Sequence, residues 1–247
     1  MRTRGNIFVL GLPSVISLLF LYSFAVTYLT TEPTQFGIYR ERQDWLYVHV
    51  LAGSLALLLG PVQLWLGLNR RTAIQHRILG GFYVAAVLAT CGAAFYLAAH
   101  TDFGWVFGLG LSSMAATAVI ATVLAVIAVC LRRVEQHREW MIRSYVVMFG
   151  FVTFRVLESA LEIAKAGTIT ERMTAAAWLA WTVPLLITES ILQGRKIFGK
   201  AAPSAAAQAA LVHTSQAQLP FDPRSVLAVN ASRIAEDTTS DFSLGKK

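Results

Sequence analysis

Six long apolar runs constrain the fold of this chain more than any other feature. A helix that crosses the hydrocarbon core of a bilayer needs about 20 consecutive, mostly apolar residues. Runs of this kind extend over Ile7–Leu29, Trp45–Leu68, Ile78–Ala99, Trp105–Leu131, Trp140–Ala164 and Met173–Gln193. Because a helix satisfies its own backbone hydrogen bonds in lipid, these runs predict an all-α, polytopic membrane helix bundle with six transmembrane helices.

The composition agrees with lipid as the surrounding solvent. The chain is 55% hydrophobic and only 14% charged, whereas roughly a quarter of the residues in a soluble domain are charged. The formal net charge of +7 comes from basic residues that lie between the apolar runs. We therefore expect loops at the face of a lipid bilayer and no nucleic-acid partner.

The distribution of lysine and arginine predicts the orientation. If the N-terminus is inside, one set of loops carries eleven basic residues: Arg2, Arg4, Arg70, Arg71, Arg77, Arg132, Arg133, Arg138, Arg195, Lys196 and Lys200. The opposite set carries four: Arg40, Arg42, Lys165 and Arg172. Since positive loops face the cytoplasm, both termini are expected there. The first run is longer than the apolar core of a signal peptide, about 15 residues, so we expect it to be retained.

The chain changes character after about residue 200. The segment AAPSAAAQAA is of low complexity, and the residues after it are rich in Ser, Thr, Asp and Pro. Such a segment cannot bury enough apolar surface to fold alone. We predict two parts, a transmembrane domain over residues 1–200 and a disordered cytoplasmic tail over residues 201–247.

The sequence Gln-His-Arg occurs twice, at residues 75–77 and 136–138, each time after a pair of arginines and before an apolar run. The second and third runs, and the fourth and fifth, then form two similar hairpins that enter the membrane from the same side. An internal duplication explains this pattern, and so do two inward loops that are basic independently. His76 and His137 either contribute to a site on the cytoplasmic side or contact lipid head groups beside the arginines.

Ionisable residues inside the apolar runs indicate two candidate sites, because a charge in hydrocarbon is costly and needs a partner. Residues spaced by three and four along the fifth run form one stripe from His137 to Glu162. At the outer end, depth along the helices predicts a buried polar site of His49, Arg155, Glu158 and Glu162, with His100 nearby. The alternative is an Arg–Glu pair that only fixes helix packing. Mixed nitrogen and oxygen donors suit a divalent metal or a proton relay.

At the cytoplasmic side, Arg143 and Glu189 lie about one turn inside the membrane on the fifth and sixth runs, so we predict that they pair. A stripe of small residues also marks the second run and favours close helix packing, either within the bundle or between copies. It comprises His49, Gly53, Ala56, Gly60, Gln63 and Gly67.

Several of these motifs, taken in order, resemble a family of predicted bacterial membrane proteins, domain of unknown function 2306. They are His49-x3-Gly53, Gly60-Pro61-x-Gln63, His76-Arg77-x2-Gly80-x2-Tyr83, the segment from His137 to Tyr145, Arg155 and Glu189. The resemblance covers roughly residues 45–193. It implies a helical bundle in the cytoplasmic (inner) membrane of a bacterium and no particular activity.

The chain is also more loosely similar to di-haem cytochromes of the b561 type, in which histidines on alternate helices hold haem. This similarity implies at most one haem b, between His76 and His137. Both histidines are followed directly by arginine at the membrane edge, whereas haem ligands usually lie deeper. We keep the metal-ligand candidates as His49, His76 and His137, and the alternative is that no metal is bound.

Three functions remain open from the sequence. The first is a protein that handles electrons or protons through the buried His, Arg and Glu residues. The second is a small transporter or ion-coupled carrier, and the third is a non-catalytic subunit of a larger membrane complex or homo-oligomer. No nucleotide-binding or hydrolase motif occurs, so enzyme activity on a soluble substrate is not expected and no catalytic residue is assigned.

Overall fold

The computed structural model describes residues 14–25, 41–67 and 73–198, and every regular element in these ranges is a helix. A short apolar helix over Ser14–Ser23 overlaps a π-helical turn, η1 (Leu21–Ala25). The longer helices are α3 (Gln43–Gly67), α4 (Ala73–Ala99), α5 (Trp105–Cys130), α6 (Val134–Met148), α7 (Gly150–Ile163) and α8 (Ile169–Phe198). The predicted all-α class is therefore confirmed for this part of the chain.

The prediction of six transmembrane helices is confirmed only in part. Among the described residues, four helices are long and apolar enough to cross a membrane, namely α3, α4, α5 and α8. Both ends of the first predicted run, residues 7–13 and 26–29, lie outside the described residues, as do the basic loop around Arg70 and Arg71 and the predicted tail from residue 201. Those predictions stay untested.

The fifth predicted span is interrupted and forms two shorter helices. α6 ends at Met148 and α7 begins at Gly150, with Phe149 between them. The N–H of Val152 donates to the carbonyl of Phe149, three residues back, at 2.9 Å, which is a tighter turn than the α-helical spacing of four. A Cβ on Gly150 would lie 3.0 Å from the sulfur of Met114 and 3.3 Å from Cβ of Trp181. A glycine at this position lets α5 and α8 approach the chain closely.

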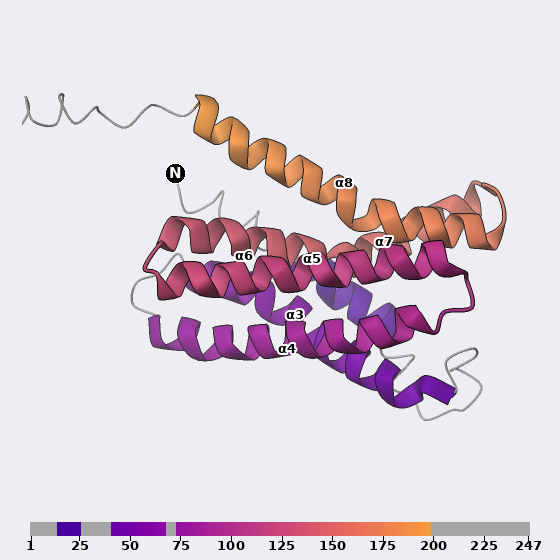
Figure 1. Cartoon of the computed structure of the whole chain (residues 1–247), viewed down its shortest axis with the longest axis horizontal. Coiled ribbons are helices and arrows are strands. Elements are labelled where there is room, and N and C mark those ends of the chain that lie inside the picture. Colours follow the sequence, from indigo (N-terminus) through magenta and orange to yellow (C-terminus); the bar gives the residue numbers. More distant parts are fainter. Residues whose placement is uncertain (1–13, 26–40, 68–72, 199–247) are drawn as a thin grey trace, which may run out of the picture. The chain divides into compact units, whose positions relative to one another are not determined.

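The helices α3 to α7 form two antiparallel hairpins that pack side by side. α3 lies along α4 and α5 lies along α6, while α4 also contacts α5 (Figure 1). The largest buried cluster lies between them and includes Tyr83, Val87, Met114 and Val147. We call the end of the bundle at which α4 and α6 begin and α5 ends the basic end.

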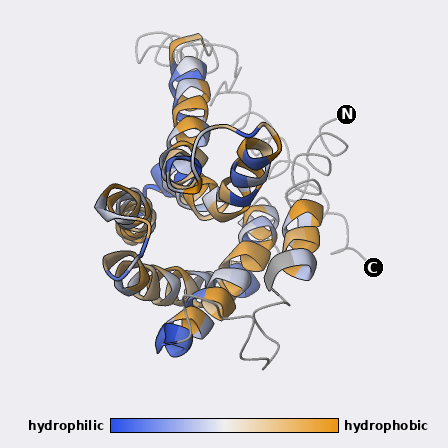
Figure 2. Cartoon of the chain, turned by 90° about the vertical axis from the view of Figure 1, so that its right-hand side faces the viewer, coloured by the Kyte–Doolittle hydropathy of each residue, from blue (hydrophilic) through white to orange (hydrophobic). Residues whose placement is uncertain are grey.

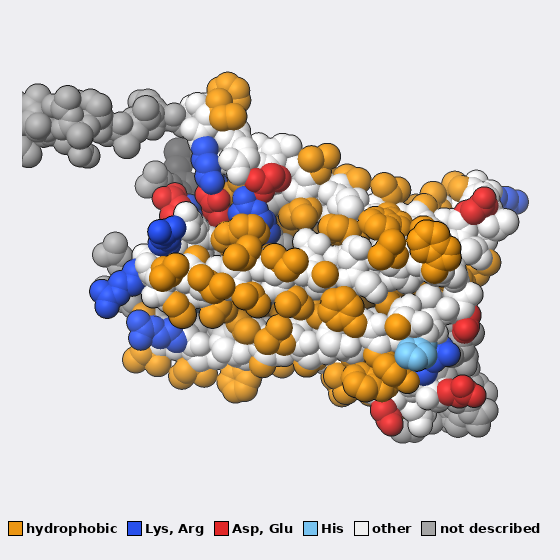
Figure 3. Space-filling view, in the orientation of Figure 1, with side chains coloured by type: hydrophobic (Ala, Val, Ile, Leu, Met, Phe, Trp, Pro, Cys, Tyr) orange, Lys and Arg blue, Asp and Glu red, His pale blue; other side chains and the backbone are white. Residues whose placement is uncertain are grey.

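The outer surface of the helices is apolar, as a lipid environment requires. Large side chains such as Trp65, Ile120 and Leu186 are more than half exposed, and apolar residues surround the helices in Figure 2. In Figure 3, apolar side chains cover the middle of the visible face and charged side chains gather toward its two ends. Because these faces cannot be solvated in water without a large cost, the described helices fit a bilayer.

The stripe of small residues on α3 packs within the bundle. His49, Gly53, Ala56, Gly60 and Gln63 are all buried. A Cβ added to Gly60 would overlap the ring of Tyr145 on α6. Close approach of helices at small residues is the usual basis of packing in membranes, and here it joins the two hairpins.

Candidate functional site

Two histidines face each other at the basic end. His76 is the fourth residue of α4 and His137 is the fourth residue of α6. Their ring centres are 6.3 Å apart and the ring planes are nearly perpendicular, at 89°. The two Gln-His-Arg segments thus occupy equivalent positions at the starts of two parallel helices, and the structure brings these predicted residues together.

Both rings are held by a partner on the neighbouring helix. Nδ1 of His137 lies 2.9 Å from the carbonyl oxygen of Ala125 on α5, to which it donates when it carries the proton. Nδ1 of His76 lies 2.7 Å from the side-chain amide of Gln63 on α3. In the amide orientation that satisfies both of its atoms, Gln63 also donates to the carbonyl of His76 at 3.1 Å and accepts from the N–H of Gly80 at 2.7 Å. A contact at Nδ1 fixes the orientation of each ring.

A layer of buried hydroxyl groups lies two helical turns deeper than the histidine pair. Tyr83 and Ser144 each follow their histidine by seven residues. The hydroxyl of Tyr83 is 2.9 Å from Oγ of Ser144, and Oγ1 of Thr122 on α5 is 2.7 Å from the same oxygen. Because all three side chains are fully buried, these hydrogen bonds join α4, α5 and α6 without access to water.

A third histidine, His49, is buried and is bonded on the opposite half of the bundle. Its Nδ1 lies 3.0 Å from the carbonyl oxygen of Thr90, and Oγ1 of Thr90 donates to the carbonyl of His49 at 2.9 Å. The ring also packs on Phe151, with ring centres 4.5 Å apart. α3 and α4 are thereby joined by paired polar contacts in an otherwise apolar region.

A cavity of about 150 Å³ lies beside His49. Arg155 and Phe154 of α7 line it, together with apolar residues of α3, α4 and α5 and the polar side chains Ser54 and Thr101. The structure therefore brings together His49 and Arg155, two of the four residues of the predicted outer site.

The cavity does not include the rest of the predicted outer cluster, which stays a prediction. Glu158, Glu162 and His100 do not line this cavity; Glu162 is exposed, and Nδ1 of exposed His100 contacts the carbonyl oxygen of Tyr96 at 2.8 Å. Among residues whose positions are described, no three His, Cys, Asp or Glu side chains could share a metal ion. Depth along a helix places a residue at a level, but the direction of its side chain decides which neighbours it meets.

The predicted pair of Arg143 and Glu189 is confirmed. Nη2 of Arg143 lies 2.7 Å from Oε2 of Glu189, and its Nε donates to the same oxygen at 2.8 Å. The pair belongs to a larger network, because Nη1 of Arg143 is 3.6 Å from Glu139 and Nζ of Lys196 is 2.8 Å from Glu139. The guanidinium also lies over the ring of Trp140, 4.7 Å from its centre. These contacts connect α6 with the last turns of α8.

Sequence reasoning missed the partners Thr90, Ser144, Glu139 and Lys196. For Glu139 a signal exists, since it precedes Arg143 by four residues and such pairs meet on a helix. The hydroxyl residues give no comparable signal, because Ser and Thr in a spanning helix commonly bond their own backbone.

The fold and these buried contacts define a polytopic α-helical membrane protein. The model of one family, predicted membrane protein (DUF2306), matches residues 46–192. Because this match covers more than half of the 247 residues, the chain belongs to that family. No curated protein and no solved structure matches the chain.

Proposed function

We propose that this protein is a membrane electron-transfer protein that binds one b-type haem between His76 and His137, near the cytoplasmic face. The facing histidine pair is the observation that carries the proposal. Two imidazoles that hold one metal ion between them use metal–nitrogen bonds of about 2 Å, so their ring centres lie a little more than ~6 Å apart. The separation of 6.3 Å between the two ring centres agrees with this requirement.

The surroundings of the two histidines also fit ligation. A ligand histidine normally donates its second ring N–H to a carbonyl or another polar group, which fixes the ring and strengthens the metal bond. Ala125 supplies that carbonyl for His137. Gln63 lies against Nδ1 of His76, and in the orientation that satisfies both of its amide atoms it donates to this nitrogen. Ligation through Nε2 requires the opposite orientation, in which the amide oxygen accepts from an Nδ1–H and the bonds to the carbonyl of His76 and the N–H of Gly80 are given up. Gly67 leaves room beside the ring, since a Cβ there would lie 3.3 Å from Cε1 of His76.

When bound, haem would supply a one-electron couple, and the residues of the chain would position it. His76 and His137 would hold the iron, while Gln63 and Ala125 would orient the two rings. The buried layer of Tyr83, Ser144 and Thr122 separates this end from the outer half of the bundle. α5 carries no histidine that could face His49, which supports a single haem.

The absorption spectrum of purified protein tests this proposal. We expect a Soret band and a reduced-minus-oxidised difference spectrum in the wild type, and loss of both in His76→Ala and His137→Ala. His100→Ala is the matched control, because His100 is exposed and contacts only Tyr96 among the interactions described above. A colourless and monodisperse wild type, prepared from haem-replete cells, would rule the proposal out.

The outer cavity favours a second function, a small ion-coupled carrier. An arginine and a histidine beside a cavity inside a membrane bundle commonly mark an ion or proton pathway. The volume of about 150 Å³ holds roughly five water molecules at ~30 Å³ each. Proton flux into sealed vesicles that contain the purified protein distinguishes this function. It should fall in His49→Phe and Arg155→Gln, and it should be unchanged in His100→Phe.

A further inference from the structure

A large groove opens between α6 and α8 at the basic end. Its volume is about 750 Å³. The residues that matter for its chemistry are Trp140, Arg143, Trp181, Leu185, Glu189 and Lys196. The groove is within the size range of sites for small organic ligands, roughly 300–1,000 Å³.

The groove exists because only the first half of α8 packs on the bundle. Ala176, Ala177 and Ala180 are fully buried, and a Cβ on Gly110 of α5 would lie 3.3 Å from Cβ of Ala177. Pro184 follows inside the helix, where it removes one backbone hydrogen bond and allows a bend. Beyond it, α8 diverges from α6 (Figure 1).

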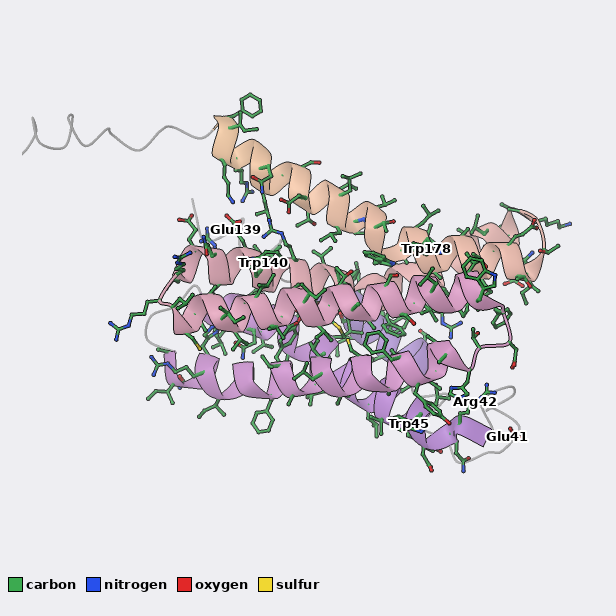
Figure 4. All side chains as sticks on the ribbon, viewed as in Figure 1. Glu41, Arg42, Trp45, Glu139, Trp140 and Trp178 are labelled. Atoms are coloured by element: carbon green, nitrogen blue, oxygen red, sulfur yellow. The ribbon has the colours of Figure 1, made fainter. Side chains whose placement is uncertain are left out.

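Long charged side chains span the gap where the helices separate. The pair of Arg143 and Glu189 and the pair of Lys196 and Glu139 both connect α6 to α8. In Figure 4, Glu139 and Trp140 lie on α6 near the diverging end of α8. The mouth of the groove is thus polar and its walls are largely apolar and aromatic.

The charges in the groove favour a neutral occupant. Two cations and two carboxylates line it, and each cation already has a carboxylate partner within 2.8 Å. Sites for anionic lipid head groups are clusters of unpaired Lys and Arg. A charged or zwitterionic head group would have to break an existing ion pair here, whereas a neutral group with oxygen acceptors would leave both pairs in place.

The walls favour a flat head group with an apolar tail. Trp140 and Trp181 contribute aromatic surface from the two sides of the groove, and aromatic faces stack well on planar rings. Leu186, which also lines the groove, is 68% exposed on the lipid side of α8. An isoprenoid tail that leaves past this residue would stay in the bilayer.

We infer that this groove binds a membrane-soluble quinone, with the head group between Trp140 and Trp181 and the tail in the lipid. The inference does not rest on the haem, because binding requires only the groove. A quinone at this place would lie next to α6, the helix that carries His137, and within reach of the carboxylates Glu139 and Glu189.

Calorimetric titration of a short-tailed benzoquinone into the full-length protein in lipid nanodiscs tests the inference, with empty nanodiscs correcting for partition into lipid. Saturable binding is expected. Leu185→Trp should fill the groove and weaken the affinity by about tenfold or more. Leu179→Trp is the matched control, since Leu179 lies on the exposed side of the same helix and does not line the groove. Leu186→Trp is a second blocking variant that folds even if Leu185→Trp does not, because its side chain faces lipid.

Three outcomes overturn the inference. The first is the absence of saturable binding to the wild type, and the second is equal affinity in the wild type and both blocking variants. The third is displacement of the quinone by a modest excess of phosphatidylethanolamine or phosphatidylglycerol in the nanodisc, which would assign the groove to a lipid head group. A colourless protein that binds quinone would contradict the proposed haem and leave the quinone site supported.

Discussion

The two hairpins, α3–α4 and α5–α6, begin their second helices with the same three residues but differ in what surrounds them. Aligned on their histidines, Glu139 and Arg143 of α6 correspond to Ile78 and Phe82 of α4. The two apolar residues are more than half exposed, whereas the two charged side chains are largely buried beneath α8. The same helical positions therefore carry lipid-facing side chains where no helix covers them and an ion-pair network where one does.

The hairpins also differ in how their own helices are joined. In the first, the side chains of His49 and Gln63 on α3 bond to α4. In the second, α5 offers a backbone carbonyl and one hydroxyl, at Ala125 and Thr122. The comparison shows that each hairpin contributes one member of the facing histidine pair, while the buried histidine His49 belongs to the first hairpin alone.

A substitution at the junction between the hairpins should give the largest loss of stability. We expect Gly60→Leu to destabilise the protein by about 3 kcal/mol or more, because the new side chain overlaps the ring of Tyr145 and both helices must shift. Thermal unfolding in detergent, followed by size-exclusion chromatography, measures this change. Gly92→Leu is the control, since nothing lies within 4 Å of a Cβ at that position. Similar losses in both variants would contradict close packing of α3 on α6.

Removal of a charge that distinguishes α6 from α4 should give the next largest loss of stability. We expect Arg143→Ala to cost about 2 kcal/mol, because it leaves Glu189 and largely buried Glu139 without their shared cation. Arg143→Glu and Glu189→Arg should each reduce the yield of folded protein in the membrane, and the double variant should recover it. If the double variant expresses no better than either single variant, the pair does not hold α8.

Removal of one hydroxyl group from each hairpin should give a smaller loss of stability and compares the two hairpins directly. We expect Thr90→Val to cost about 1 kcal/mol, since it removes the hydrogen bond that joins α4 to the backbone of α3. Thr122→Val should cost about half as much, because Thr122 donates within its own helix to Ala118 and Ser144 keeps its contact with Tyr83. Unfolding midpoints of the two variants, measured side by side, check the order. The reverse order would mean that the second hairpin depends more on side-chain bonds than the first.

A substitution at the exposed end of the ion-pair network should give the smallest loss of stability. Lys196 has a half-exposed side chain, and exposed ion pairs contribute at most about 1 kcal/mol. We expect Lys196→Ala to lower stability by less than ~0.5 kcal/mol at low salt and to have no effect at high salt. Thermal unfolding at two salt concentrations tests this, with Arg143→Ala as the comparison, because its effect should persist at high salt.

The pairing of Arg143 with Glu189 could be predicted because two constraints act together. A charge inside a membrane needs a partner, and the rise of a helix fixes the depth of each residue. The same reasoning holds for His76 and His137, which start parallel helices at one level. For both pairs a common depth was enough, because one member lies on α6 and its side chain meets a neighbouring helix. Arg143 meets Glu189 on α8, and His137 meets His76 on α4.

The outer site could not be predicted to the same extent. The stripe along the fifth run holds as far as Arg155, which lines the cavity with His49. Glu158 and Glu162 follow on the same helix, α7, but do not line the cavity, so the spacing along the stripe did not decide which side chains border it. Thr90 could not be predicted as a partner, because the sequence does not distinguish a threonine that bonds its own helix from one that bonds a neighbouring helix.

The interruption at Phe149 also divides the molecule mechanically. A continuous helix transmits a tilt along its whole length, whereas a break in its hydrogen-bond ladder lets each half move with its own neighbours. α6 carries His137 and is fastened to α5, and α7 carries Arg155 beside the outer cavity. A tilt of α7 that opens or closes that cavity can therefore leave the spacing of the two facing imidazoles unchanged.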